Sequence, residues 1–120
     1  MQVSELFRRS ILVPADDASR DDLDCEDVSE NTRVDIIRIP SDDFFDEVLD
    51  MGVFNFVNDR VGSLIGDYET ERIAPAQIAR VLPELQNVVA YSDRAREFLN
   101  DFSRLCRLAM ERNMPVYFVL

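Results

Sequence analysis

A long amphipathic pattern covers residues 92–113 and is the most regular feature of the chain. Apolar side chains recur there every three or four residues, which is the spacing of a helix with one buried face. The sequence therefore predicts a long helix ended by Asn113, a residue type suited to the left-handed conformation found at many helix ends. The apolar members of this face are Ala95, Phe98, Leu99, Phe102, Leu105, Cys106 and Ala109.

Shorter helical patterns precede it. Ser41 is a favourable N-cap and is followed by acidic residues, which suit the positive end of a helix. Gly52 should interrupt this helix, after which the apolar period restarts and continues to Gly66. A third helix is expected from Pro75, with a kink at Pro83. The buried face of the first of these helices comprises Phe44, Phe45, Val48 and Leu49.

Three segments predict strands. Residues 34–40 are rich in β-branched side chains and end at a proline. Residues 115–120 form an unbroken apolar run that is too short for a helix, which indicates an interior strand buried on both faces. Residues 2–13 fit a short helix that runs into a strand. Together the elements predict one α+β domain over residues 1–120, with three to four helices on one face of a small β-sheet that includes the C-terminal strand.

The segment 14–32 differs in composition from the rest of the chain. It holds eight acidic residues against one arginine, a net charge of -7 out of a total of -11. Because little of it is apolar, we expect a mobile acidic loop anchored only by Leu23 and Val28.

Charge and composition exclude several classes of function. With 24 acidic and 13 basic residues and no histidine or lysine, the chain has no histidine-activated nucleophile, no Schiff-base lysine and no histidine-bearing zinc site. The net charge of -11 repels nucleic acid and anionic membranes, so a partner attracted over long range would be basic. Without a signal peptide or an apolar segment of membrane length, we expect a cytoplasmic protein.

No pattern of acids predicts catalysis or cofactor binding. The spacing of a calcium loop is absent, and no acidic pair has the apolar surroundings that raise a carboxyl pKa. We therefore expect no catalytic residue, no metal and no cofactor. The acids instead divide into the segment 14–32 and a set on predicted folded elements. Charges on a folded element are already oriented, whereas a mobile loop must be ordered on binding at about 1 to 2 kcal/mol per residue. The folded set, with one tyrosine, is the candidate partner-binding site: Asp42, Asp43, Asp46, Glu47, Asp50, Asp67, Tyr68, Glu69 and Glu71.

The stretch 66–75 allows two interpretations. It joins two predicted helices and carries Tyr68 among three acids. Tyr68 either packs on the core within a purely structural connection, or supplies amphipathic contact area at a rim whose acids meet arginines or lysines of a partner.

Residues 67–75, the long helix after them and the terminal run 116–120 resemble small acidic immunity proteins that bacteria encode beside contact-dependent or type VI-delivered toxins. The resemblance implies a protein without catalytic residues that binds a cognate toxin and blocks its active site. The charge indicates a toxin with a basic site that acts on nucleic acid or nucleotides. The alternatives are an acidic interaction module outside any toxin system, such as an adaptor or regulatory subunit, and a carboxylate-based enzyme.

Overall fold

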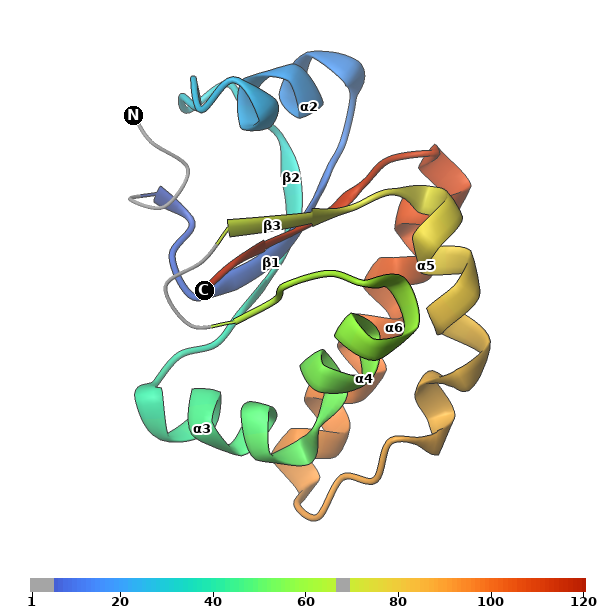
Figure 1. Ribbon diagram of the computed structural model, residues 1–120. Coiled ribbons are helices and arrows are strands. Elements are labelled where there is room, and N and C mark those ends of the chain that lie inside the picture. The colour runs from blue at the N-terminus through green and yellow to red at the C-terminus, as the bar shows by residue number, and fades with distance from the viewer. Residues whose placement is uncertain (1–5, 67–69) are drawn as a thin grey trace.

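A four-stranded antiparallel sheet forms the middle layer of the fold, with helices on both sides (Figure 1). The structure is a computed structural model and describes residues 6–66 and 70–120. The strands lie in the order β2-β1-β4-β3. Their bounds are Ser10–Pro14 for β1, Val34–Arg38 for β2, Thr70–Ile73 for β3 and Val116–Val119 for β4. The α+β fold and the place of the C-terminal strand in the sheet are therefore as the sequence predicts.

The C-terminal strand β4 lies in the interior of the sheet, as its apolar run predicts. It pairs with β1 on one side, where Leu12 lies opposite Tyr117, and with β3 on the other, where Arg72 lies opposite Tyr117. All four residues of β4 are buried. Alternate side chains of β4 enter two separate clusters: Phe118 faces the main core, and Tyr117 faces the opposite layer. A strand buried on both faces has no need of polar side chains, which explains the composition.

One face of the sheet is covered by four α-helices and a 3-10 helix. Their bounds are Asp42–Met51 for α3, Val53–Val61 for α4, Pro75–Val81 for α5, Leu82–Asn87 for η1 and Asp93–Arg112 for α6. An aromatic cluster joins these helices to the sheet: the Phe118 ring lies 5.9 Å from the Phe54 ring and 5.8 Å from the Phe102 ring, both edge to face. Such pairs contribute about 0.5 to 1.5 kcal/mol each beyond the area that they bury.

The opposite face is covered by α2, Asp17–Asp24 (Figure 1). The expectation of a mobile acidic loop over residues 14–32 is therefore wrong for residues 17–24, which form this helix. The expectation that all helices pack on one face of the sheet is also wrong, because α2 packs on the other face. Leu23 and Val28 are buried, as expected, against Leu12 and Tyr117. Apolar content underestimates the order of this segment, because polar groups hold much of it together.

The helix ends agree with the sequence in most places. The Ser41 hydroxyl accepts a hydrogen bond from the backbone N–H of Phe44, and Gly52, at φ 85°, separates α3 from α4. However, α4 ends at Gly62, at φ 72°, and not at Gly66. At Pro83 the chain continues as η1 instead of a kinked α-helix. Asn113 ends α6 in the left-handed conformation, as predicted.

Strand β3 has no counterpart in the sequence interpretation, which treats residues 66–75 as a connection. Only Ile73 of its four residues is buried, because β3 lies at the edge of the sheet. An edge strand needs few apolar side chains, so its pattern is weak. The described part of the chain contains five α-helices, α2 to α6, against the three to four expected. None of the helices in the described part has the length and hydropathy needed to cross a membrane.

Candidate protein-binding site

The acidic face of α3 borders a groove on the protein surface. The helix begins with acids after Ser41 and buries Phe44, Phe45 and Val48, which directs the acidic rows to the solvent side. The groove has a volume of about 360 Å³. Its lining consists of Asp43, Asp46, Glu47, Asp50, Met51, Tyr91 and Ala95.

Three of these carboxylates have no cation beside them. Within residues 6–66 and 70–120, the side chains of Asp43, Asp46 and Asp50 are exposed and make no ion pair or hydrogen bond. Their spacing of three and four residues places them on neighbouring turns of one helix, where like charges repel by a few tenths of a kcal/mol per pair. Within the isolated fold, only Asp43 is compensated, by the positive end of α3 in whose first turn it lies. A cation from outside would relieve the repulsion along the row.

Tyr91 adds an aromatic side to the same groove. It lies between η1 and α6, and the residue is 91% exposed. Tyrosine combines a large apolar surface with a hydroxyl at low conformational-entropy cost, so it is enriched where proteins bind each other. Tyr91 is not among the predicted site residues, because a single aromatic residue in a connection carries no periodic signal. The sequence feature that could have drawn attention to Tyr91 is its position immediately before Ser92, the N-cap of α6.

Two predicted site residues on α3 are engaged within the protein. Asp42 Oδ1 lies 3.5 Å from Arg9 Nη2, and the Arg9 guanidinium lies over the Phe45 ring. Glu47 accepts a hydrogen bond from the Ser92 hydroxyl and another from Arg94 Nε. The Ser92 hydrogen bond, and then Arg94, hold the pKa of Glu47 below its usual value. Glu47 thus connects α3 to the start of α6.

The predicted residues outside α3 contribute less to this surface. Glu71 accepts hydrogen bonds from the backbone N–H groups of Leu64 (2.9 Å) and Arg72 (3.0 Å), so it supports the chain that leads into β3. The remaining three predicted residues, Asp67, Tyr68 and Glu69, lie outside the described residues. Both interpretations of the stretch 66–75 therefore remain predictions.

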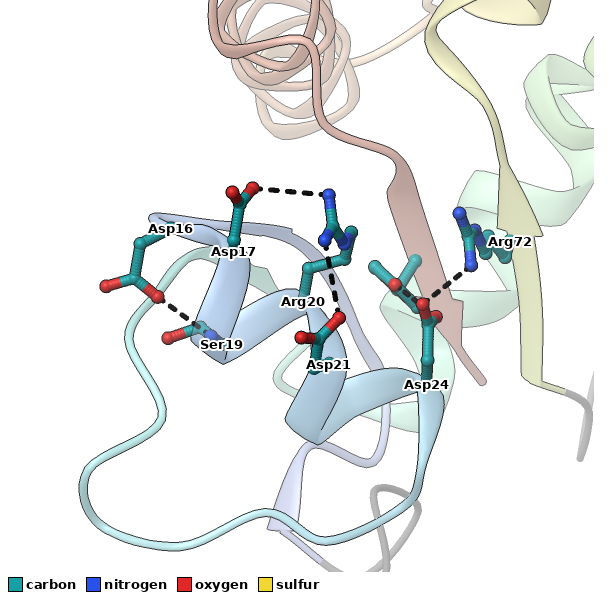
Figure 2. A network of polar contacts seen from close by, with 8 residues as sticks. Asp16, Asp17, Ser19, Arg20, Asp21, Asp24 and Arg72 are labelled. Carbon is teal, nitrogen blue, oxygen red and sulfur yellow. Dashed lines mark hydrogen bonds and ion pairs between the residues drawn. The ribbon is translucent and has the colours of Figure 1, made fainter.

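The acids of α2 contrast with those of α3, because most of them have partners inside the protein (Figure 2). Asp16 caps the helix by accepting the Ser19 backbone N–H at 2.8 Å. Hydrogen bonds from Ser19 lower the pKa of Asp16. Arg20 lies between Asp17 (3.2 Å) and Asp21 (3.3 Å). These carboxylates therefore already have partners within the segment that carries them, although Asp17 and Asp21 remain exposed.

The end of α2 is attached to the sheet by Asp24. Its carboxylate accepts the Tyr117 hydroxyl of β4 at 2.5 Å and pairs with Arg72 of β3 at 2.8 Å (Figure 2). Burial, and then the hydrogen bond to Asp24, raise the pKa of Tyr117 above its usual value. After α2, the side chains of Glu26, Asp27 and Glu30 are exposed and make no ion pair within the described residues.

The contacts of the α2 acids give a different reason for preferring the acids of α3 over those of residues 14–32 as the partner-binding site. The acids of α3 were expected to bind because a loop over residues 14–32 would have to be ordered on binding, but residues 17–24 already form the helix α2. Internal pairing separates the sets instead: α2 uses its carboxylates to hold its own structure, whereas Asp43, Asp46 and Asp50 are unpaired within the described residues, beside a groove and an exposed tyrosine.

Comparison of the chain with protein-family models, with curated proteins and with solved structures gives no match. The assignment of function therefore depends on the chemistry of the surface. Among the described residues, no three acidic or cysteine side chains converge so that they could hold a metal ion.

Proposed function

We propose that this protein binds a basic active site of a cognate bacterial toxin and blocks it, as an immunity protein. The observation that carries the proposal is the row of three carboxylates unpaired within the described residues, Asp43, Asp46 and Asp50, along a groove that also exposes Tyr91. Such a surface suits arginine and lysine side chains. Enzymes that handle nucleic acid or nucleotides carry these side chains where they bind phosphate groups.

The negative charge of the protein supports both the approach of a basic partner and its binding once docked. A protein of net charge -11 attracts a basic partner over long range, which raises association rates by about 10 to 1,000-fold at low salt. Once docked, the α3 carboxylates occupy positions that phosphates of the substrate would otherwise take. Tyr91 then contributes buried aromatic area near the charged contacts, an arrangement typical of residues that dominate binding energy.

The proposal places the protein in the cytoplasm of the cell that makes the toxin, where an inhibitor meets the toxin before export. Its test is expression of the product of the neighbouring gene, alone and together with this protein. We expect toxicity of the neighbouring product alone and normal growth when both are made.

Variants connect this test to the surface. Asp43→Asn/Asp46→Asn/Asp50→Asn should abolish protection at equal protein levels, whereas Glu26→Gln/Asp27→Asn/Glu30→Gln, which removes the same charge, should protect. A neighbouring product that is harmless on its own would overturn the immunity function. Protection that survives loss of the three α3 charges would overturn the proposed site.

A further inference from the structure

We propose that this protein forms a two-fold symmetric dimer, in which the outer edge of β2 pairs with the same edge of a second copy. The inference goes beyond the blocking function and does not rest on it. The groove beside β2 and the groove beside α3 share no lining residue, so the dimer contact is separate from the α3 surface.

The outer edge of β2 has backbone groups that are directed away from the sheet. The backbone N–H of Ile39 bonds to the Arg9 carbonyl at 2.8 Å, and the Arg33 carbonyl accepts the N–H of Ala15 at 2.9 Å. The odd-numbered residues of this segment therefore bond to β1. Because backbone groups alternate between the two sides of a strand, the outward N–H and C=O groups belong to Val34, Ile36 and Arg38. No strand within residues 6–66 and 70–120 pairs with this side.

The edge lacks the usual features that prevent strand pairing. Sheet edges are commonly short, bulged, interrupted by proline or covered by another element. β2 instead forms five consecutive pairs with β1, and proline enters only at Pro40, after the strand. Ile36 packs against the cluster on the α2 side and Ile37 against the main core, and both remain partly exposed. A second β2 strand would cover an apolar side chain on each face.

One register of the symmetric pair satisfies all the outward groups. With Ile36 opposite Ile36 of the second copy, Val34 lies opposite Arg38, and the outward residues pair only with one another. A shift of two residues in one direction places Asp35 opposite Asp35, where like charges repel. The same shift in the other direction places Val34 opposite Pro40, which has no N–H to donate. The edge thus complements itself in the register centred on Ile36.

The groove beside β2 suits a second copy because its charges balance. It has a volume of about 610 Å³ and lies between β2 and α6. Its lining holds three acids and three arginines: Asp35, Asp101, Glu111, Arg38, Arg104 and Arg107. Two copies, each of net charge -11, repel one another least where the local charge is zero. The balanced groove is therefore a place where like-charged copies can meet.

Pairing of the β2 strands also brings the two α6 helices together. The helix packs on β1 and β2, and neighbouring strands lie about 4.8 Å apart. A helix above this pair of strands therefore lies about 10 Å from its symmetry mate, within the range of packed helices. On this side of α6, Leu108 is partly exposed, and Arg107 and Glu111 have no ion-pair partner within the described residues. Across a two-fold axis, each of these charges can meet the opposite charge of the other copy.

Sedimentation over a concentration series from about 1 μM to about 1 mM tests the association. We expect a monomer–dimer equilibrium that tightens at least about threefold between about 50 mM and 500 mM salt, because salt screens the repulsion between two copies of net charge -11. Hydrogen exchange at the Val34, Ile36 and Arg38 amides should slow as the dimer forms. A chain that stays monomeric over the whole series at high salt would overturn the proposal.

Cysteine variants test the register. Ile36→Cys in a Cys25→Ser background places two cysteines opposite one another with Cα atoms about 5.5 Å apart, within reach of a disulfide. Val34→Cys in the same background is the control, because this position is about 14 Å along the strand from its symmetry mate. Mild oxidation should cross-link Ile36→Cys at least about tenfold faster than Val34→Cys, a ratio well above one that marks the register. Cys106 is buried and serves in both variants unchanged. Equal rates would exclude this pairing.

A charged variant tests the contact itself. Ile36→Lys places two lysines opposite one another and should raise the dimer Kd at least about tenfold, although it reduces the net negative charge. Leu64→Lys, the matched change at a position that is 72% exposed, should not weaken the dimer. Because the cysteine variants keep small apolar side chains at β2, they test the pairing even where Ile36→Lys lowers stability. Unchanged association of Ile36→Lys would contradict the proposal. So would a monomeric chain whose Val34, Ile36 and Arg38 amides become protected only when the product of the neighbouring gene is added, which would assign the edge to a foreign strand.

Discussion

The hydroxyl of Tyr117 donates a hydrogen bond to the carboxylate of Asp24, 93 positions earlier in the chain. The bond crosses from the interior strand β4 to the end of α2. Asp24 also binds Arg72, so α2, β3 and β4 meet at one carboxylate. This connection explains how a strongly acidic segment becomes a helix on the sheet: its charges are satisfied by partners elsewhere in the fold.

Loss of this bond should loosen α2 without unfolding the domain. Tyr117→Phe keeps the buried ring and removes the hydroxyl, so we expect the free energy of unfolding to fall by about 1 to 2 kcal/mol. Hydrogen exchange should quicken in α2 more than in α6. Tyr91→Phe is the control, since Tyr91 is exposed and should tolerate the change. Equal stability of Tyr117→Phe and the wild type would show that the bond does not anchor α2.

The connection between α3 and α6 should depend on pH. Because the folded protein lowers the pKa of Glu47 below its usual 4.5, the ionised carboxylate stabilises the fold above that pH. This contribution is lost as the pH falls from 4.5 through the lower folded pKa. We therefore expect Glu47→Gln to be less stable than the wild type at neutral pH, and the difference to shrink below pH 4.5 in denaturant titrations. Glu97→Gln is the control, because Glu97 lies at an exposed position of α6; its difference in stability from the wild type should not shrink in this way. A difference that grows on acidification would contradict the role of Glu47.

The two cysteines should differ in reactivity. Burial raises the pKa of the Cys106 thiol from 9.0 to about 12, so the folded protein keeps it neutral and covered. Cys25 is exposed. A thiol reagent should therefore label one cysteine in the native protein and both after denaturation. The buried thiol also favours the folded state below pH 9.0, and this stability is lost as the pH rises from there toward 12. Rapid labelling of the native Cys25→Ser variant would show that Cys106 is accessible.

Removal of charge from α3 should not weaken the fold. In Asp43→Asn/Asp46→Asn/Asp50→Asn, each relieved repulsion between neighbouring turns is worth about 0.2 to 0.5 kcal/mol. This gain offsets the loss of about 0.3 to 1 kcal/mol from the charge of Asp43 in the first turn of α3, so thermal or denaturant unfolding should show a stability close to that of the wild type. Asp24→Asn is the contrast, because it breaks contacts with Tyr117 and Arg72 and should destabilise the protein. A large loss of stability in the triple variant would mean that these acids serve the structure and not a partner.

The parts of the fold that depend on local pattern were predictable. The apolar period of α6, the N-cap Ser41, the break at Gly52 and the interior strand β4 each arise from residues close together in sequence. The parts that depend on distant partners were not. The helix α2 is held through Thr32, Arg72 and Tyr117, and β3 forms only because β4 offers it an edge.

The same distinction applies to the site. Sequence placed the α3 acids on the solvent face, because amphipathic spacing determines the face of a helix. It did not reveal that Glu47 is bound by Ser92 and Arg94, nor that Tyr91 lies beside the acidic row. Both facts depend on the packing of α6 against α3, which brings together residues as far apart in sequence as Glu47 and Ser92, separated by 45 positions.

The central claim is that α3, and not the acids that follow α2, forms the energetic centre of binding. Under the proposed immunity function, its most direct test is the dissociation rate of the complex with the product of the neighbouring gene. The account predicts that Asp43→Asn/Asp46→Asn/Asp50→Asn speeds dissociation by about 30-fold or more, since losing buried charge pairs costs about 2 kcal/mol or more. Glu26→Gln/Asp27→Asn/Glu30→Gln, with the same change of charge, should slow association by a few-fold and leave dissociation unchanged. Normal dissociation of the α3 variant, together with rapid dissociation of the other, would contradict the account.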